Sequence, residues 1–294
     1  MGTPGLLRWF KVLVLVGVVC NCVLFSLGAS AWAADAAAQP LTELDRIKQQ
    51  GRLEVVMFFE DVPPFFMHNR QGVLVGIDPQ LAQDIAEKLG VKVSFNRQPQ
   101  TFDAVIDRLA LGEADIAISL LSNTLNRALQ VNFSEEYVVL RQTLLANRLQ
   151  LAQRFPQAQT NDEIRAQLNQ AGLKIGVIQG TSYVDFLKTD YPLATPVLYS
   201  DFSRMIRDVE TGDLFALLYD ELEVLNWRYD HPDIGLRLKM ILLGDRQDTI
   251  AIAVNRQDKE LLTWLNLYLA KMRNDGSLDR LIKTYLEHSD WRTQ

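Results

Sequence analysis

Three short segments of the sequence carry side chains that could hold the two charged ends of one small molecule. Arg127 presents a planar fork of donors that matches a carboxylate, and Ser122 lies shortly before it as a natural helix N-cap. The Gly180-Thr181-Ser182 turn offers two hydroxyls and the N-terminus of a following helix, where an anion is stabilised. Asp220 offers a carboxylate for a cation. Together these groups are complementary to a zwitterion such as an amino acid.

Each segment also has a plain structural interpretation. Arg127 could be a surface residue balanced by Glu135 or Glu136, and the Thr181-Ser182 turn could merely cap a helix. Solvated acids at strand ends are common, so Asp220 is not decisive alone. The residues by themselves leave these alternatives open, and the combination carries more weight than any one segment.

The elements that must position these segments alternate between strands and helices. Apolar residues recur at fourfold spacing over 77–89, with Gly90 as a C-cap, and again over 102–109. After a polar stretch at 149–159 the same alternation restarts. The expected strands are 52–59, 91–95, 116–121, 174–178 and 214–219, and further helices are expected at 162–171, from 183 and at 201–210. Two successive βαβ series predict an α/β fold in two lobes, each a mainly parallel sheet flanked by helices.

The end of the chain departs from this order. A strand at 249–254 is followed by helices at 259–272 and 278–286. The extended stretches 138–147 and 248–254 are candidates for the two crossings of a hinge. We therefore expect lobe 1 to comprise residues 41–143 plus 246–294, and lobe 2 residues 144–245.

The N-terminus is typical of an export signal. Arg8 and Lys11 precede an apolar run that ends before Ala31-Trp32-Ala33, a small-residue cleavage site, so residues 1–33 are predicted to be a signal peptide. An uncleaved membrane anchor is the alternative, because the run approaches the length of a bilayer span. Cys20 and Cys22 are the two cysteines of the chain, and both lie inside this segment. No disulfide is expected after cleavage.

Charge and composition exclude several functions. The formal net charge is −6, and no basic stripe of the kind that binds nucleic acid is present. The three histidines are isolated and have no metal-ligand spacing. We expect no metal and no cofactor.

Nine landmarks in a fixed order resemble the amino-acid-binding proteins of polar amino acid ABC transporters, solute-binding protein family 3, which have the type II periplasmic-binding fold. The match spans about Leu44 to Trp291. The landmarks are Pro63-Pro64-Phe65, Gly76-Ile77-Asp78 before a helix ending Leu89-Gly90, Phe102, Gly112-Glu113-Ala114-Asp115, Thr124-x-x-Arg127, Phe133-Ser134-x-x-Tyr137, Gly176-Val177-Ile178-Gln179-Gly180-Thr181, Gly212-Asp213 leading to Asp220, and Asn274-Asp275-Gly276.

The resemblance implies a role for each candidate residue. Arg127 looks like the clamp for the ligand α-carboxylate, and Asp220 like the acceptor of the α-ammonium. Leu120 stands where a small residue normally offers its carbonyl to the ammonium, so its bulk is a departure that puts side-chain specificity in doubt. The remaining implied ligand-binding residues are Ser122, Thr181 and Ser182 around the carboxylate, Phe102 and Phe65 as an apolar wall, and Glu60 and Asp61, with Asp248, for side-chain specificity.

The resemblance also implies a function. The chain would be a periplasmic protein, not an enzyme, that closes its lobes on an L-amino acid and delivers it to an ABC transporter permease in the inner membrane. We expect a monomer. An orphan sensor that signals to a receptor is one alternative, and a dehydratase using Glu60 or Asp61 as general acid is another. The acids favour a polar or cationic ligand side chain, and the identity of the amino acid stays open.

Overall fold

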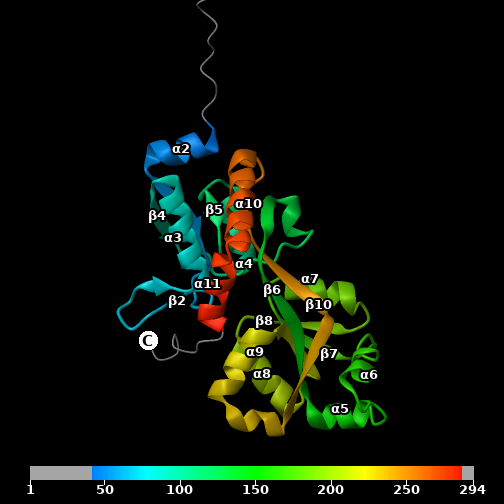
Figure 1. Ribbon diagram of the computed structural model, residues 1–294. Coiled ribbons are helices and arrows are strands. Elements are labelled where there is room, and N and C mark those ends of the chain that lie inside the picture. Colours follow the sequence, from blue (N-terminus) through cyan, green and yellow to red (C-terminus); the bar gives the residue numbers. More distant parts are fainter. Residues whose placement is uncertain (1–41, 287–294) are drawn as a thin grey trace, which may run out of the picture. The chain divides into compact units, whose positions relative to one another are not determined.

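The computed structural model describes residues 42–286, and two long strands link its two halves (Figure 1). One eight-stranded sheet has the order β4-β1-β5-β10-β6-β9-β7-β8. Its strands are β1 (Arg52–Val56), β4 (Lys92–Asn96), β5 (Ile116–Ala117), β6 (Val131–Asn147), β7 (Lys174–Ile178), β8 (Thr195–Tyr199), β9 (Ala216–Asp220) and β10 (Leu238–Asn255), and β2 (Met67–His68) pairs with β3 (Leu74–Val75) in a separate ribbon. The helices are α2 (Glu43–Gln50), α3 (Ile77–Leu89), α4 (Phe102–Ala110), α5 (Arg148–Arg154), α6 (Asn161–Arg165), α7 (Tyr183–Asp190), α8 (Phe202–Thr211), α9 (Glu221–Asp230), α10 (Lys259–Asn274) and α11 (Ser277–Leu286), with short 3-10 helices η1 (Arg127–Leu129) and η2 (Pro232–Leu236).

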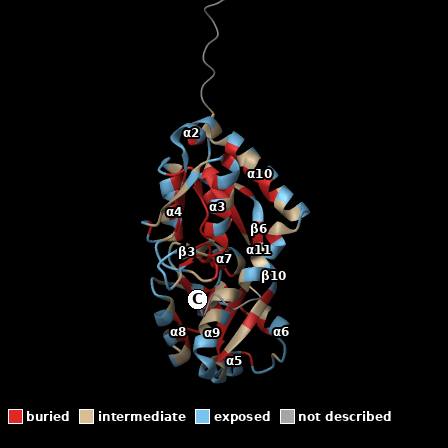
Figure 2. Ribbon diagram, turned by 60° about the vertical axis from the view of Figure 1, so that its left-hand side comes forward, coloured by how far each residue is buried: buried red, intermediate tan, exposed pale blue. Residues whose placement is uncertain are grey.

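The first half contains parallel strands covered by amphipathic helices. Strand β1 pairs with β4 on one side and β5 on the other, parallel in both cases. The predicted helix at 77–89 is present as α3, which buries Ile77, Leu81, Ile85 and Leu89 and ends at Gly90 in the left-handed conformation. Buried positions concentrate along the strands and on the inner faces of the helices (Figure 2). The period of 3.6 residues in the sequence thus corresponds to the face that packs on the sheet.

Strands β6 and β10 are antiparallel neighbours of 17 and 18 residues, and they pass from one hydrophobic core to another. Along β6, Leu140 belongs to the first core and Leu144 to the second. Along β10, Leu243 belongs to the second core and Ile250 to the first. The chain therefore crosses from the first core to the second along β6 and returns to the first along β10 (Figure 1).

The second half repeats the parallel arrangement. Strand β7 pairs in parallel with β8 and with β9, and β9 pairs antiparallel with β6. Helix α8 packs closely on this sheet at Gly176. A Cβ atom placed there would lie 2.9 Å from Met205 and 2.8 Å from Leu214, so a larger residue would push helix and sheet apart.

Several elements differ in detail from the sequence predictions, including the strand predicted at 52–59, which ends at Val56. The strand predicted at 116–121 ends at Ala117, and Leu120 then adopts a positive φ of 49°. The chain meets β10 again at Ser122, which forms an isolated antiparallel bridge with Ile250. The helix predicted at 162–171 is confined to Asn161–Arg165, because Gln167 and Leu168 bond carbonyls three residues back, as in a turn. Helix α9 (Glu221–Asp230), which the sequence pattern did not indicate, follows Asp220 directly.

The N-terminal segment predicted to be a signal peptide is not part of the described structure. The predicted signal peptide, residues 1–33 with its two cysteines, lies outside the described residues. Among residues 42–286, none of the helices combines the length and apolar character needed to span a bilayer.

Candidate functional site

The three predicted segments meet at one small cavity, although they are far apart in the sequence. Arg127 and Asp220 both line this cavity, whose volume is about 20 Å³. One wall comes from the loop after β5, and the other from the turn after β7 and from the end of β9. The cavity is lined by Phe102, Leu120, Ser122, Arg127, Leu140, Thr181, Ser182, Tyr183, Tyr219, Asp220 and Asp248.

Arg127 is a buried cation, with only 5% of its surface exposed. Its Nε and Nη2 atoms donate to Oδ1 of Asp103 at 3.2 and 2.9 Å, and Nη1 lies 3.4 Å from the carbonyl oxygen of Ser122. The Thr124 hydroxyl accepts the backbone N–H of Arg127 and fixes the start of η1. The surface interpretation of Arg127 is therefore wrong. Asp103, which the sequence analysis did not single out, is its partner.

The hydroxyls of the two walls touch each other. Ser122 Oγ and Ser182 Oγ are 2.8 Å apart, and the Asp103 N–H donates to the carbonyl oxygen of Gly180 at 3.0 Å. Gly180 has a φ of 72°, and a Cβ there would come within 2.7 Å of Thr101. Glycine is required at this turn, because it allows the backbone of one wall to approach the other so closely. Thr181 donates its hydroxyl to the carbonyl oxygen of Ile178 at 2.7 Å, which holds the turn in place.

Asp220 and Asp248 place two buried carboxyl groups beside Arg127. Asp220 caps α9 by accepting the N–H of Glu223 at 2.8 Å, and burial raises its pKa to about 6. Asp248 accepts the Tyr183 hydroxyl at 3.2 Å, and burial raises its pKa to about 7. Within the described residues Oδ1 of Asp248 has no hydrogen-bond partner, and neither has Oε1 of Gln142 nearby on β6. Unpaired buried acceptors of this kind favour a bound donor.

Leu120 is held in the left-handed conformation by a buried acid. Its N–H donates to Asp78 at 2.7 Å, and Asp78 also accepts the Tyr137 hydroxyl at 2.7 Å. Burial raises the pKa of Asp78 to about 7. A side chain is strained at a φ of 49°, and the bond to Asp78 holds Leu120 in this conformation.

A second cavity of about 380 Å³ adjoins the first. It shares Phe102, Thr181 and Tyr219 with the small cavity, and the predicted residues Glu60 and Asp61 lie in its wall. The rest of the wall is Phe58, Phe59, Val62, Gln100, Thr101, Ile178, Gln179, Ser200, Phe202 and Glu223.

Of the predicted residues, Asp61 is already ion-paired and Phe65 lies away from both cavities. Asp61 is not a free carboxylate, because Arg97 donates to it at 2.8 Å and His68 at 2.9 Å. Partial burial raises the pKa of Asp61, but the bonds from His68 and Arg97 outweigh burial and lower it overall. Phe65 is 1% exposed in the first hydrophobic core, and it lines neither cavity.

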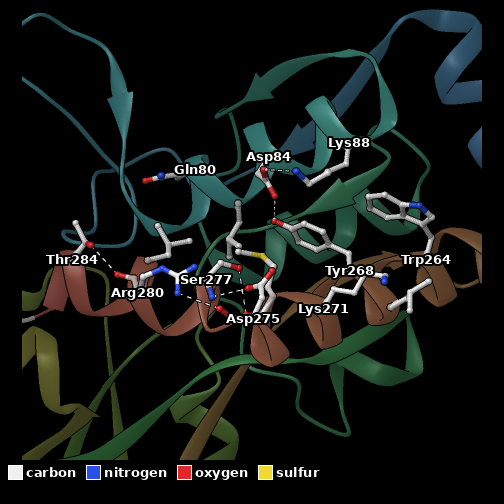
Figure 3. Close-up of a pocket in the computed structure, with 14 residues that line it drawn as sticks. Gln80, Asp84, Lys88, Trp264, Tyr268, Lys271, Asp275, Ser277, Arg280 and Thr284 are labelled. Atoms are coloured by element: carbon white, nitrogen blue, oxygen red, sulfur yellow. Dashed lines mark hydrogen bonds and ion pairs between the residues drawn. The ribbon is translucent and has the colours of Figure 1, made fainter.

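A hollow larger than either cavity lies elsewhere, between α3, α10 and α11 (Figure 3). Its volume is about 670 Å³, and none of the predicted site residues lines it. Several of its polar groups bond to one another: Lys88 to Asp84, the Tyr268 hydroxyl to Asp84, and Arg280 to the carbonyl oxygen of Asp275. We call this hollow the outer groove.

Several neighbours of the two cavities were missed by sequence reasoning. They are Asp103, Phe58, Phe59, Tyr183, Phe202, Tyr219 and Glu223. Glu223 had one available signal, since an acid three residues after a capping Asp is typical of a helix start. Within residues 42–286, no group of three His, Cys, Asp or Glu side chains is placed to hold a metal ion.

Two α/β cores connected by two long antiparallel strands, with polar strand ends facing each other, define the two-lobed type II periplasmic-binding fold. The chain belongs to the bacterial extracellular solute-binding proteins, family 3, whose family model matches residues 55–288.

Individual relatives agree with this assignment. The ABC transporter arginine-binding protein 1 of Escherichia coli is 24% identical over 220 residues, covering 74% of this chain and 84% of that protein. The L-cystine-binding protein TcyJ of Escherichia coli is 24% identical over 270 residues, covering 91% and 92%. The crystal structure of the ancestral amino-acid-binding protein AncCDT-1, described as a precursor of cyclohexadienyl dehydratase, aligns with a TM-score of 0.65 and 26% identity, covering 83% of this chain and 99% of that one.

Proposed function

We propose that this chain captures an L-α-amino acid outside the cytoplasm and presents it to an ABC transporter permease in the inner membrane. The observation that carries the proposal is that Arg127 and Asp220, buried groups of opposite charge, line one cavity. Membership of the family and the names of the arginine- and cystine-binding relatives support it. We further propose that the protein acts in the periplasm as a monomer, after loss of residues 1–33.

The carboxylate of the ligand would bind Arg127. A single oxygen of Asp103, Oδ1, accepts bonds from Nε and Nη2 of Arg127. N–H donors on Nη1 and Nη2 therefore remain available for a second carboxylate. The hydroxyls of Ser122 and Ser182, which bond to each other in this structure, would turn to the same carboxylate. Thr181 would contribute through the turn that it holds in place.

The ammonium of the ligand would bind Asp220. An ammonium carries three donors, and the cavity offers more than one buried acceptor for them. Oδ1 of Asp248 is without a partner among the described residues, and the Leu120 carbonyl lies on the same wall. A bound ammonium would lower the pKa of Asp220 and of Asp248 and keep both ionised at neutral pH.

Binding would require the two walls to part and close again. A cavity of about 20 Å³ holds little more than a water molecule, whereas ligand pockets measure roughly 300–1,000 Å³. We propose residues 41–143 plus 246–294 as lobe 1 and 144–245 as lobe 2, with β6 and β10 as the hinge. The separation of the hydrophobic cores along these strands supports this division. A ligand that prefers the closed form by about 10⁴-fold would move the population from mostly open to mostly closed.

A dehydratase function has less support. The structure of an amino-acid-binding precursor of such an enzyme shares the fold, but a general acid must carry a proton at working pH. The bonds from Arg97 and His68 keep Asp61 ionised, so it is a poor donor. Turnover of a cyclic carboxylic acid substrate by the purified protein would contradict the binding function.

A thermal-shift screen of the twenty L-amino acids tests the proposal. A ligand confined to the folded state stabilises it by about 2.7 kcal/mol at a hundred times its dissociation constant, so the melting temperature rises by several degrees. We expect a subset of amino acids to raise it. If none does so at millimolar concentration, the chain does not bind amino acids and the proposal is wrong.

A further inference from the structure

The side chain of a bound amino acid would enter the second cavity. This cavity shares Phe102, Thr181 and Tyr219 with the small cavity that holds Arg127 and Asp220. A ligand whose backbone groups occupy the small cavity would therefore extend its side chain past these three residues. The chemistry of the second cavity then decides which side chain is accepted.

The walls of the second cavity are rich in aromatic rings. Phe58 stacks on Phe102 with ring centroids 4.6 Å apart, and Phe59 meets Phe58 edge to face at 5.0 Å. On the opposite wall Phe202 packs against Tyr219 at 5.1 Å. The faces of such rings attract guanidinium and ammonium groups, and they also accept apolar stems. Rings alone do not distinguish a cation from an apolar side chain.

The charges of the cavity do distinguish them. Three carboxylates, Glu60, Asp61 and Glu223, line it, and its described lining contains no lysine, arginine or histidine. Asp61 is balanced by Arg97 at 2.8 Å. Glu60 and Glu223 form no ion pair with any described residue. Two acidic side chains at the cavity therefore have no basic partner among the described residues.

These two carboxylates belong to a larger acidic cluster around Tyr219. Burial, and then the charges of Asp220, Glu223, Asp248 and Glu60, raise the pKa of Tyr219 well above its usual value. Burial, and then the charge of Asp220, raise the pKa of Glu223 to about 8. Arg127 is the one basic side chain in the described lining of the two cavities, and its charge is already balanced by Asp103. In the free protein Glu223 is therefore mostly protonated at neutral pH. A positive charge on the ligand side chain would lower the pKa of Glu223 and pair with its ionised form, whereas a neutral side chain would not.

We infer that Glu223, together with Glu60, forms an anionic subsite for the cationic end of the ligand side chain, so that the substrates are basic L-α-amino acids carrying a guanidinium or ammonium group. The inference rests on the proposed function and names its substrate class. Glu223 reaches the cavity from the first turn of α9, the helix that Asp220 caps. One short segment thus supplies the acceptors for both positive groups of the ligand.

Isothermal titration calorimetry with isosteric ligands tests the inference. L-arginine and L-citrulline differ in a guanidinium against a neutral ureido group, and we expect L-arginine or L-lysine to bind at least tenfold more tightly than L-citrulline. Glu223→Gln should weaken L-arginine binding about ten- to a hundredfold, the effect of losing one charge-assisted bond, and leave L-citrulline binding unchanged. Asp230→Asn, at the exposed far end of the same helix, is the matched control and should change neither affinity.

The outcomes separate the two claims. If L-citrulline or another neutral amino acid binds as tightly as L-arginine, or if Glu223→Gln weakens both ligands equally, the anionic subsite is wrong and the proposed function stands. If no α-amino acid binds, both are wrong. Because Glu223 has no described ion pair, we expect the melting temperature of Glu223→Gln to equal or exceed that of the unmodified protein. Such a melting temperature would show that the variant is folded.

Discussion

The outer groove and the cleft formed by the two adjoining cavities differ in what their polar groups do. The outer groove is the larger, at about 670 Å³ against about 20 and 380 Å³ for the two cavities of the cleft. In the groove Asp84 bonds to Lys88 and to Tyr268, so its charge is balanced locally (Figure 3). In the cleft Asp248 retains an unbonded oxygen, and Glu223 lacks a counter-ion among the described residues.

This comparison shows that volume alone does not mark a binding site. Leaving buried polar groups unsatisfied costs free energy, and a protein retains such a cost where a ligand supplies the missing partner. In the outer groove a ligand would have to displace bonds that already exist. In the cleft it would complete bonds that are incomplete.

The largest expected effect is on binding, and it comes from Arg127→Ala. The α-carboxylate of the ligand would be buried without its partner, at a cost of about 3–5 kcal/mol, so affinity should fall by two to three orders of magnitude or more. Arg280→Ala removes a cation of the outer groove and should leave affinity unchanged. Calorimetry on both variants checks the contrast, and equal losses would show that the two regions do not differ in function.

A second prediction concerns pH and the free protein. In the folded state burial raises the pKa of Asp220 to about 6, and the pKa values of Asp78 and Asp248 to about 7. These values lie above the unfolded value of about 3.9. At a pH between the unfolded and the folded pKa values, the folded state therefore binds more protons than the unfolded state, and the free energy of unfolding falls as pH rises. We expect the melting temperature to decrease between about pH 5 and pH 8, and Asp248→Asn to make the decrease shallower. A melting temperature that rises over this range in calorimetric scans would contradict the burial of these acids.

A smaller effect is expected from Tyr268→Phe in the outer groove. The change removes the hydroxyl that donates to Asp84 at 2.8 Å, and the net value of such a bond is about 1 kcal/mol of unfolding free energy. Amino acid affinity should stay the same. Urea unfolding and calorimetry together check this, and a change in affinity without a change in stability would give the groove a functional role.

Sequence reasoning located the parts of the cleft that lie at strand ends. Thr181 and Ser182 follow β7, Asp220 ends β9, and these two parallel strands bring their carboxyl ends to one edge of a sheet. Arg127 follows β5 in the other half, whose apolar run is likewise visible in the sequence. The same periodicity predicted α3 closely, because its buried face repeats regularly.

The sequence could not predict contacts that depend on the approach of the second core to the first. Glu223 and Tyr219 face Glu60 across the cleft only because β6 and β10 bring the two cores together. The ion pair of Asp61 is a further example. Arg97 lies just after the neighbouring strand β4, and pairing of β1 with β4 brings Arg97 to Asp61. Such partners are set by strand order, which periodicity does not encode.

The most direct test of the account is a double-mutant cycle on the ammonium subsite. The preferred amino acid and its deaminated analogue are titrated into the unmodified protein and into Asp220→Asn, which keeps an N-cap side chain on α9 but removes the charge. We predict that loss of the ammonium weakens binding at least a hundredfold in the unmodified protein and less than fivefold in the variant. Equal losses in the two proteins would contradict the account, because Asp220 would then not hold the ammonium.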